Sequence, residues 1–207
     1  MLLVGRDLSP FVRRCAVTLQ LYGLSAERAD YSTATQLDEI RQYNKLGRVP
    51  ALVLDSGETL IDSSAILDHL DEVAGDQRLT PAAGAERRAT LRVIHHALGV
   101  AEKSILYSYE QNPAMRDPEH ISQRWMKRLL SQGAGGLAAL ETELGNKEWF
   151  VGQGMTQADV TAAVVYDFVD FMVPALLEPQ PCPHLAALTR RLSELDAFRA
   201  TSLDKYR

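Results

Sequence analysis

The sequence reads Ser9-Pro10-Phe11-Val12-Arg13-Arg14 shortly after the apolar run Leu2-Leu3-Val4-Gly5. This order predicts a buried strand that gives way to a helix, with Pro10 at the first helical position, where its missing N–H costs nothing. A helix begins with free backbone N–H groups and the positive end of its dipole. Ser9 therefore stands where an anion, including a thiolate, can be held, although a serine here can also act only as a helix cap.

A second segment, Asn44-Lys45-Leu46-Gly47-Arg48-Val49-Pro50, precedes two strand-like runs at 51–54 and 59–61. Turn residues separate the runs and predict a hairpin. A cis bond between Val49 and Pro50 is energetically accessible, because the cis form of an X–Pro bond is only about 0.5–1 kcal/mol less stable than the trans form. The backbone N–H and C=O of Val49 then face outward and can pair with an extended peptide ligand. The alternative is a trans proline at the first residue of a strand, which is common.

A third segment, Asp62-Ser63-Ser64, closes the hairpin and opens a helix that Gly75 ends. These residues are typical helix caps. In a binding role, the N–H and hydroxyl of Ser63 would hold a carboxylate at the helix N-terminus, and Asp62 would hold the neighbouring ammonium. The two residues together would recognise an amino-acid end, such as a γ-glutamyl group.

Beyond residue 84 we find no convincing strand, and apolar residues recur at helical spacing. A helix is expected from about 86 to 110, and a second from Asp117, with Pro118 at its first position, to Leu144. Thr156 and Asp159 predict a capping box at the start of a third. The turn-rich stretch 79–84 reads as a linker, so we expect two domains, residues 1–77 and 85–207.

Composition restricts the classes of function. The chain has 207 residues, 46% of them hydrophobic, and a formal net charge of −5, without the basic excess typical of nucleic-acid binding. No apolar run is long enough to span a membrane, and two cysteines make no disulfide framework, so we expect a cytoplasmic protein. Cys15 falls on the apolar face of the first helix and reads as a core residue. We expect no metal, because no set of ligands has metal spacing.

The three segments occur in an order that resembles the soluble glutathione transferases, of the bacterial kind whose amino-terminal motif reads Ser-Pro-Phe-Val-Arg. The resemblance covers nearly the whole chain. In the carboxy-terminal part it rests on Gly152 and on Thr156-Gln157-Ala158-Asp159-Val160. It implies an α/β thioredoxin-like, glutathione-binding amino-terminal domain followed by an all-α helical domain.

The resemblance implies a role for each matching residue. Ser9 would hydrogen-bond the sulfur of glutathione and favour its thiolate. Val49 would pair its backbone with the tripeptide, with Pro50 cis, while Asp62 and Ser63 would hold the γ-glutamyl end.

Two further residues, Phe11 and Gln36, are also expected to contact glutathione. Gln36 is a candidate for the glycine carboxylate, because the stretch 32–38 offers no basic residue. Two positions depart from the common pattern: Lys45 stands where many relatives have proline, and Asp62 is one methylene shorter than the usual glutamate or glutamine.

The function that the resemblance implies is a glutathione transferase that adds the activated thiolate to a small hydrophobic electrophile, as in detoxification. A homodimer is expected, with no nucleic-acid or membrane partner. Two alternatives stay open. One is a non-catalytic regulator of the same fold, similar to the stringent starvation protein, and the other is a glutathione-dependent isomerase or dehalogenase that uses the same site.

Overall fold

The computed structural model describes residues 1–206 and divides into two compact units. The first contains Met1–Thr80 together with residues 193–206, and the second contains Pro81–Leu192. The sequence placed residues 85–207 in one helical domain. The last part of the chain instead packs with the first unit.

The first unit is built on a four-stranded sheet in the order β2-β1-β3-β4. Strand β1 pairs parallel to β2 and antiparallel to β3, and β3 and β4 form the expected antiparallel hairpin. At the centre of the sheet, Leu3 lies opposite Arg28 on one side and Leu52 on the other. The strands are β1 (Leu2–Val4), β2 (Glu27–Ala29), β3 (Ala51–Val53) and β4 (Thr59–Ile61).

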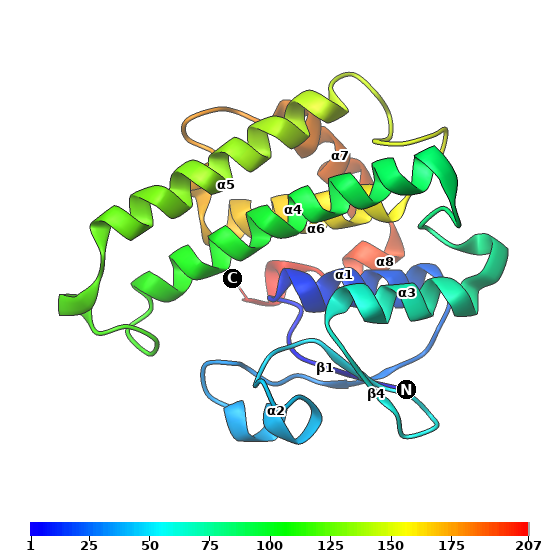
Figure 1. Cartoon of the computed structure of the whole chain (residues 1–207), viewed down its shortest axis with the longest axis horizontal. Helices are drawn as coiled ribbons and strands as arrows, with labels where there is room; N and C mark the ends of the chain where they lie inside the picture. The colour runs from blue at the N-terminus through cyan, green and yellow to red at the C-terminus, as the bar shows by residue number, and fades with distance from the viewer. Residues whose placement is uncertain (207) are drawn as a thin grey trace. The chain divides into compact units, whose positions relative to one another are not determined.

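The helices of the first unit lie on both sides of this sheet. Figure 1 shows α1 and α3 on one side of the strands and α2 on the other. Pro10 occupies the first turn of α1, as the sequence predicts, and Gly75, with φ 59°, ends α3. The elements are α1 (Pro10–Leu21), α2 (Leu37–Tyr43), α3 (Ser63–Ala74) and the short η1 (Gly75–Gln77), α8 (Asp196–Arg199) and η4 (Leu203–Tyr206).

The core of this unit joins α1 and α3 to the central strands. Its side chains are almost entirely shielded from solvent, so their burial supplies the main stabilisation of the unit. Cys15 is among them and is fully buried, which confirms it as a core residue. The buried cluster consists of Leu3, Val12, Cys15, Ala16, Leu19, Leu52, Ile66, Leu67 and Leu70.

The second unit is entirely helical among its described residues. Its long helix α4 packs against both α5 and α6. No helix among residues 1–206 is both long enough and apolar enough to cross a membrane. The elements are α4 (Gly84–Gln111), η2 (Pro118–His120), α5 (Gln123–Leu144), α6 (Gln157–Met172), η3 (Pro174–Leu176) and α7 (Pro183–Ser193), whose last residue falls in the first unit.

The helix expected from Asp117 begins later than the sequence indicates. Asp117 opens only the short η2, and Ser122 caps α5 by accepting a hydrogen bond from the N–H of Trp125. The buried carboxylate of Glu110 explains the delay, because it accepts from the N–H of Ser122 and from Arg116 and so fixes the connection as a loop.

The second unit confirms the expected capping box and also explains the glycines of α5. Thr156 and Asp159 form a reciprocal capping box at the start of α6. Glycines in α5 allow close helix packing, since a Cβ on Gly133 would lie 2.2 Å from Leu176 and one on Gly136 would lie 2.6 Å from Val100. These contacts explain glycines that helix propensity alone disfavours.

Candidate functional site

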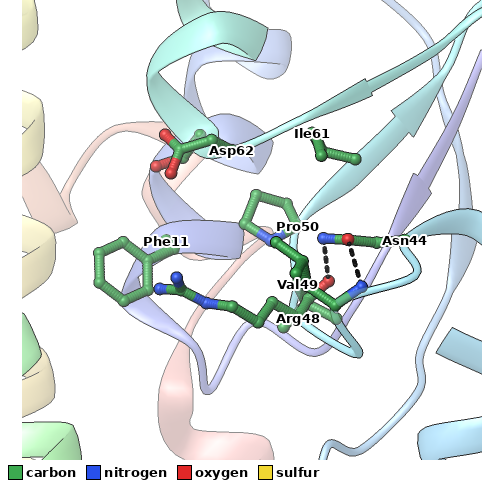
Figure 2. A pocket seen from close by; sticks show the side chains of 9 residues that line it. Phe11, Asn44, Arg48, Val49, Pro50, Ile61 and Asp62 are labelled. Atoms are coloured by element: carbon green, nitrogen blue, oxygen red, sulfur yellow. Dashed lines mark hydrogen bonds between the residues drawn. The ribbon is translucent and has the colours of Figure 1, made fainter. Parts of the chain in front are cut away.

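A small cavity of about 70 Å³ opens in the first unit where the three segments singled out in the sequence meet. Figure 2 shows its residues from close by. Five residues of the sequence prediction line it: Phe11, Val49, Pro50, Asp62 and Ser63. The cavity is completed by Asn44, Leu46, Arg48 and Ile61.

Val49 offers an unused pair of backbone groups at this cavity. The Val49–Pro50 bond is cis, as expected, and within residues 1–206 neither the N–H nor the C=O of Val49 is hydrogen-bonded to another residue. The neighbouring loop comes close because Gly5 has no side chain: a Cβ there would lie 2.8 Å from the Cβ of Val49. An unpaired donor and acceptor on one residue at a cavity suit an extended peptide ligand.

The loop before Val49 is shaped by Asn44. Its side-chain amide donates to the carbonyl of Arg48 at 2.9 Å, while its Oδ1 accepts from the N–H of Leu46 at 3.0 Å (Figure 2). Gly47 supplies the left-handed conformation that the turn needs, with φ 66°. Asn44 is 5% exposed, so its bonds are sheltered from water. The side chain thus fixes the path of the chain on which Arg48 and Val49 sit.

The start of α3 forms the opposite wall. Asp62 is the one non-glycine residue with positive φ among residues 1–206, at φ 69°, and its Oδ1 accepts from the N–H of Ser64 at 2.8 Å. A strained conformation of this kind persists only where the surrounding structure enforces it and is common at ligand sites. One carboxylate oxygen caps the helix, and the side chain remains exposed to solvent. Ser63, 2% exposed, lies at the first helical position.

A buried thiol supports this wall from behind. The Sγ of Cys15 lies 3.8 Å from the carbonyl oxygen of Ser63, to which it donates. Burial raises the pKa of the Cys15 thiol to about 12, so it is protonated at neutral pH and is a poor nucleophile. Cys15 therefore supports the site without reacting in it.

Ser9 caps α1 in an extended conformation, with φ −74° and ψ 121°, but its hydroxyl bonds none of the N–H groups of that helix. It is half-buried and precedes Phe11 by two residues, without itself lining the cavity. A cap residue whose side chain is not used for capping retains its hydroxyl for another acceptor.

The structure separates Gln36 from the other predicted residues. Its Oε1 accepts from the N–H of Ser32 at 3.1 Å, within the turn before α2, and it does not line the cavity. Arg48, which sequence reasoning did not select, does line it. Figure 2 shows its side chain running toward Phe11, with the carboxylate of Asp62 on the other side of the cavity. The available signal was a basic residue directly before the Val-Pro pair.

The charges at the cavity suit a ligand with a cation at one end and an anion at the other. Arg48 is exposed and forms no ion pair within residues 1–206, so its guanidinium can bind a carboxylate in the two-pronged manner typical of arginine. No group of three or more His, Cys, Asp or Glu side chains within those residues has the geometry of a metal site.

Comparison with known proteins places these features in a family. Residues 3–78 match the sequence profile of the glutathione S-transferase N-terminal domain, and residues 111–196 match that of the C-terminal domain. A crystal structure of a glutathione transferase family member from Pseudomonas fluorescens Pf-5, with bound glutathione, has a TM-score of 0.85 and 30% identity; the match covers 96% of this chain and 97% of that one. The chain belongs to the glutathione S-transferase family.

Two relatives that resemble this chain in sequence have isomerase names. The maleylacetoacetate isomerase of Pseudomonas aeruginosa is 32% identical over 157 residues, which are 71% of each chain. A probable maleylacetoacetate isomerase 1 of Drosophila melanogaster is 29% identical over 175 residues, 79% of this chain but only 63% of that protein. The family therefore includes similar proteins with isomerase as well as transferase names, on the expected thioredoxin-like and helical architecture.

Proposed function

We propose that this protein binds glutathione in the cavity at Val49 and transfers the glutathionyl group, through its sulfur, to a small hydrophobic electrophile. The observation that carries the proposal is that the N–H and C=O of Val49 are unpaired within residues 1–206 and lie between an acidic residue, Asp62, and a basic one, Arg48 (Figure 2). Glutathione matches this order, because it has an ammonium at the γ-glutamyl end, a peptide backbone in the middle and a carboxylate at the glycine end.

In this arrangement each part of glutathione has its own partner. Asp62 binds the γ-glutamyl ammonium through the oxygen that does not cap α3, and the N–H and hydroxyl of Ser63 bind the neighbouring carboxylate. Phe11 covers the cysteinyl part. Arg48, rather than Gln36, binds the glycine carboxylate, since Arg48 lines the cavity and Gln36 does not.

Ser9 activates the sulfur by donating a hydrogen bond to it. Lowering the thiol pKa by about two units requires roughly 2.7 kcal/mol of preference for the thiolate. One charge-assisted hydrogen bond supplies about 1.5–3 kcal/mol, and the start of α1 adds up to about 1 kcal/mol. The two effects are therefore sufficient in size. The thiolate then attacks the electrophilic carbon of a conjugated enone: the C–S bond forms as the C=C π bond breaks, and the resulting enolate takes a proton from solvent.

Isomerisation is the second candidate function, favoured by the 32% identity to a maleylacetoacetate isomerase. The two reactions share the first step, addition of the thiolate, and differ in the fate of the sulfur. Conjugation retains the sulfur in the product and consumes glutathione, whereas isomerisation expels it and returns glutathione.

The test is calorimetric titration with glutathione, followed by an electrophile panel that includes a cis-configured conjugated enone. Micromolar to millimolar binding with turnover of at least one electrophile is expected. Consumption of glutathione assigns a transferase, and turnover without consumption assigns an isomerase. Absence of glutathione binding would contradict the proposal and favour the regulatory alternative.

The position of Arg48 can be tested separately with a truncated ligand. Arg48→Gln should lose about ten- to a hundredfold in affinity for glutathione, the equivalent of one charge-assisted contact. It should bind γ-glutamylcysteine, which lacks the glycine carboxylate, as well as the wild type does. Lys45→Gln, on the same exposed loop, is the matched control and should bind both ligands normally.

We also propose that the protein is a homodimer. Two exposed surfaces of opposite charge support self-association: α3 presents Asp68 and Glu72 beside Val73, and the start of α5 presents Arg124 and Arg128 beside Trp125. Val73 and Trp125 are 53% and 39% exposed, so both side chains are accessible to a second copy of the chain. Light scattering should show twice the chain mass at low salt; the mass of a single chain at micromolar concentration would contradict the proposal.

A further inference from the structure

The loop that carries Ser9 is held from one side by the edge strand β2 and the residue that follows it. Between β1 and α1, Gly5 donates its N–H to Ala29 at 2.8 Å and accepts from Arg28 at 3.2 Å. Arg6 donates its Nε to the carbonyl of Asp30 at 3.2 Å. These bonds fix the beginning of the loop, but none of them reaches the residues directly before Ser9.

Asp7 connects those residues to the other end of the chain. It is 2% exposed, and each of its carboxylate oxygens has a cationic partner: Oδ1 accepts from Arg28 at 2.6 Å and Oδ2 from Lys205 at 2.7 Å. Lys205 belongs to η4, 198 residues further along the sequence. A carboxylate is stable in so buried a place only when it is paired in this way.

The segment that carries Lys205 is itself anchored beside Ser9. Helix α8 packs on α1, and the guanidinium of Arg13, in the first turns of α1, lies 5.9 Å from the ring centre of Phe198. Phe198 and Leu203 are 2% and 3% exposed. The end of the chain thus contacts the elements on both sides of Ser9, through Asp7 before it and Arg13 after it.

We propose that Lys205 is a positioning residue for Ser9: it holds Asp7, and with it the loop that presents the Ser9 hydroxyl to the sulfur of glutathione. The proposal rests on the role assigned to Ser9 under the proposed function. Lys205 acts through Asp7 and has no contact with the ligand of its own.

The contact between Lys205 and Asp7 has a second, electrostatic effect. Asp7 alone would oppose a thiolate formed near this loop; Arg28 and Lys205 offset its negative charge, and loss of Lys205 would remove part of that offset. The other groups acting on Lys205 are Tyr206, whose ring centre lies 5.2 Å from Nζ, and the carboxylate of Asp30. Burial lowers the pKa of Lys205, but its hydrogen bond to Asp7 and the charges of Asp7, Tyr206 and Asp30 outweigh this and raise it, so Lys205 stays charged over the working pH range.

The first test measures how rigidly the loop before α1 is held, and it needs no ligand. Hydrogen exchange of the peptide covering residues 5–14 should become faster in Lys205→Gln and return to the wild-type rate in Lys205→Arg. Lys147→Gln is the matched control, because Lys147 also donates a side-chain hydrogen bond, to the carbonyl of Phe150, but in the other unit. Unchanged exchange in Lys205→Gln would overturn the proposal, whether or not the protein turns out to be a transferase.

The second test measures the pKa of the thiol of bound glutathione and the turnover. In Lys205→Gln the pKa of bound glutathione, followed by thiolate absorbance, should rise by about half to one unit, and turnover at neutral pH should fall about three- to tenfold, with little change in KM for glutathione. Lys205→Arg should restore both values. Faster exchange with an unchanged thiol pKa would show that Lys205 only stabilises the loop, and would overturn its role in positioning Ser9. If the wild type fails to bind glutathione, the proposed function and the role in positioning Ser9 are both wrong, while the exchange measurement still decides whether Lys205 holds the loop.

Discussion

The side-chain amide of Asn44 donates a hydrogen bond to the backbone carbonyl of Arg48, 2.9 Å away. This bond crosses the base of the loop that leads into Val49, and the Oδ1 of the same side chain holds the N–H of Leu46 inside it. Arg48 and Val49, which face the cavity, therefore depend for their orientation on a side chain that uses its hydrogen-bonding groups within the protein.

Asn44→Ala should weaken glutathione binding. Loss of the two loop bonds costs about 1–2 kcal/mol, part of it in folding stability and part in the preorganisation of Val49. We expect KM for glutathione to rise about two- to fivefold with kcat changed less than about twofold, because the chemical step does not involve this loop. Steady-state kinetics measure both. Lys45→Ala, at the next position and exposed, is the control, and an unchanged KM in Asn44→Ala would contradict the role assigned to the loop.

Glycines of α5 provide a stability test with an internal control. Gly133→Ala would place a Cβ 2.2 Å from Leu176, so overpacking should lower the free energy of unfolding by about 1–3 kcal/mol. Gly135→Ala meets nothing within 4 Å and should raise it by up to about 1 kcal/mol through helix propensity. Urea unfolding compares the two variants. Equal effects of the two substitutions would show that the contact with Leu176 is not formed.

The capping box at α6 should matter for folding and not for binding. Thr156→Ala or Asp159→Ala removes bonds to N–H groups at the helix start and should lower stability by roughly 0.5–2 kcal/mol. Thr156→Ser retains the hydroxyl and serves as control. Thermal unfolding and glutathione titration are measured on the same samples. A variant with normal stability and lost glutathione affinity would show that the box has been assigned the wrong role.

Both cysteines should be unreactive in the folded protein. Burial raises the pKa of Cys15 to about 12 and, with the charge of Glu141, that of Cys182 to about 11. At pH 8 their thiolate fractions are about one in ten thousand and one in a thousand, so a thiol reagent should modify them only after unfolding. Rapid modification of either in the native protein would contradict the burial seen here.

The raised pKa values of Cys15 and Cys182 also make the free energy of unfolding depend on pH. Between the unfolded thiol pKa, near 8.5, and the raised folded values, the folded state binds more protons than the unfolded state does. The free energy of unfolding should therefore fall as the pH rises above about 9, by up to roughly 1.4 kcal/mol per pH unit for each thiol. Cys15→Ser should reduce this slope, measured by urea unfolding at pH 8 and pH 10. A slope that is unaffected by the substitution would contradict the assignment to Cys15.

The parts of the fold that the sequence predicted have strong local signals. Pro10 marks the start of α1, turn residues mark the hairpin, and Thr156 with Asp159 marks α6. Strand β2 lacked such a signal, because Glu27–Ala29 is a short edge strand with two charged residues. Helix α2 was missed for a similar reason: it has seven residues and buries only Ile40.

The site was predicted less completely than the fold, for a physical reason. Val49, Asp62 and Ser63 belong to motifs whose chemistry is local, and the structure brings them to one cavity. Arg48 was overlooked because an exposed arginine has no pattern of its own, and its orientation depends on the bond to Asn44. The packing of the last residues onto the first unit depends on contacts across nearly the whole sequence, such as that of Lys205 with Asp7, which no local pattern reveals.

The most direct test of the central claim is the pH profile of glutathione conjugation by Ser9→Ala, with thiolate absorbance measured in parallel. The variant should still bind glutathione through Val49, Asp62 and Ser63, while the pKa of the bound thiol rises by about one to two units. Turnover at neutral pH should fall about ten- to a hundredfold, and the loss should shrink toward pH 9, where the thiol ionises unaided. A profile identical to that of the wild type would contradict the claim and leave the Ser9 hydroxyl with no role in activating the sulfur.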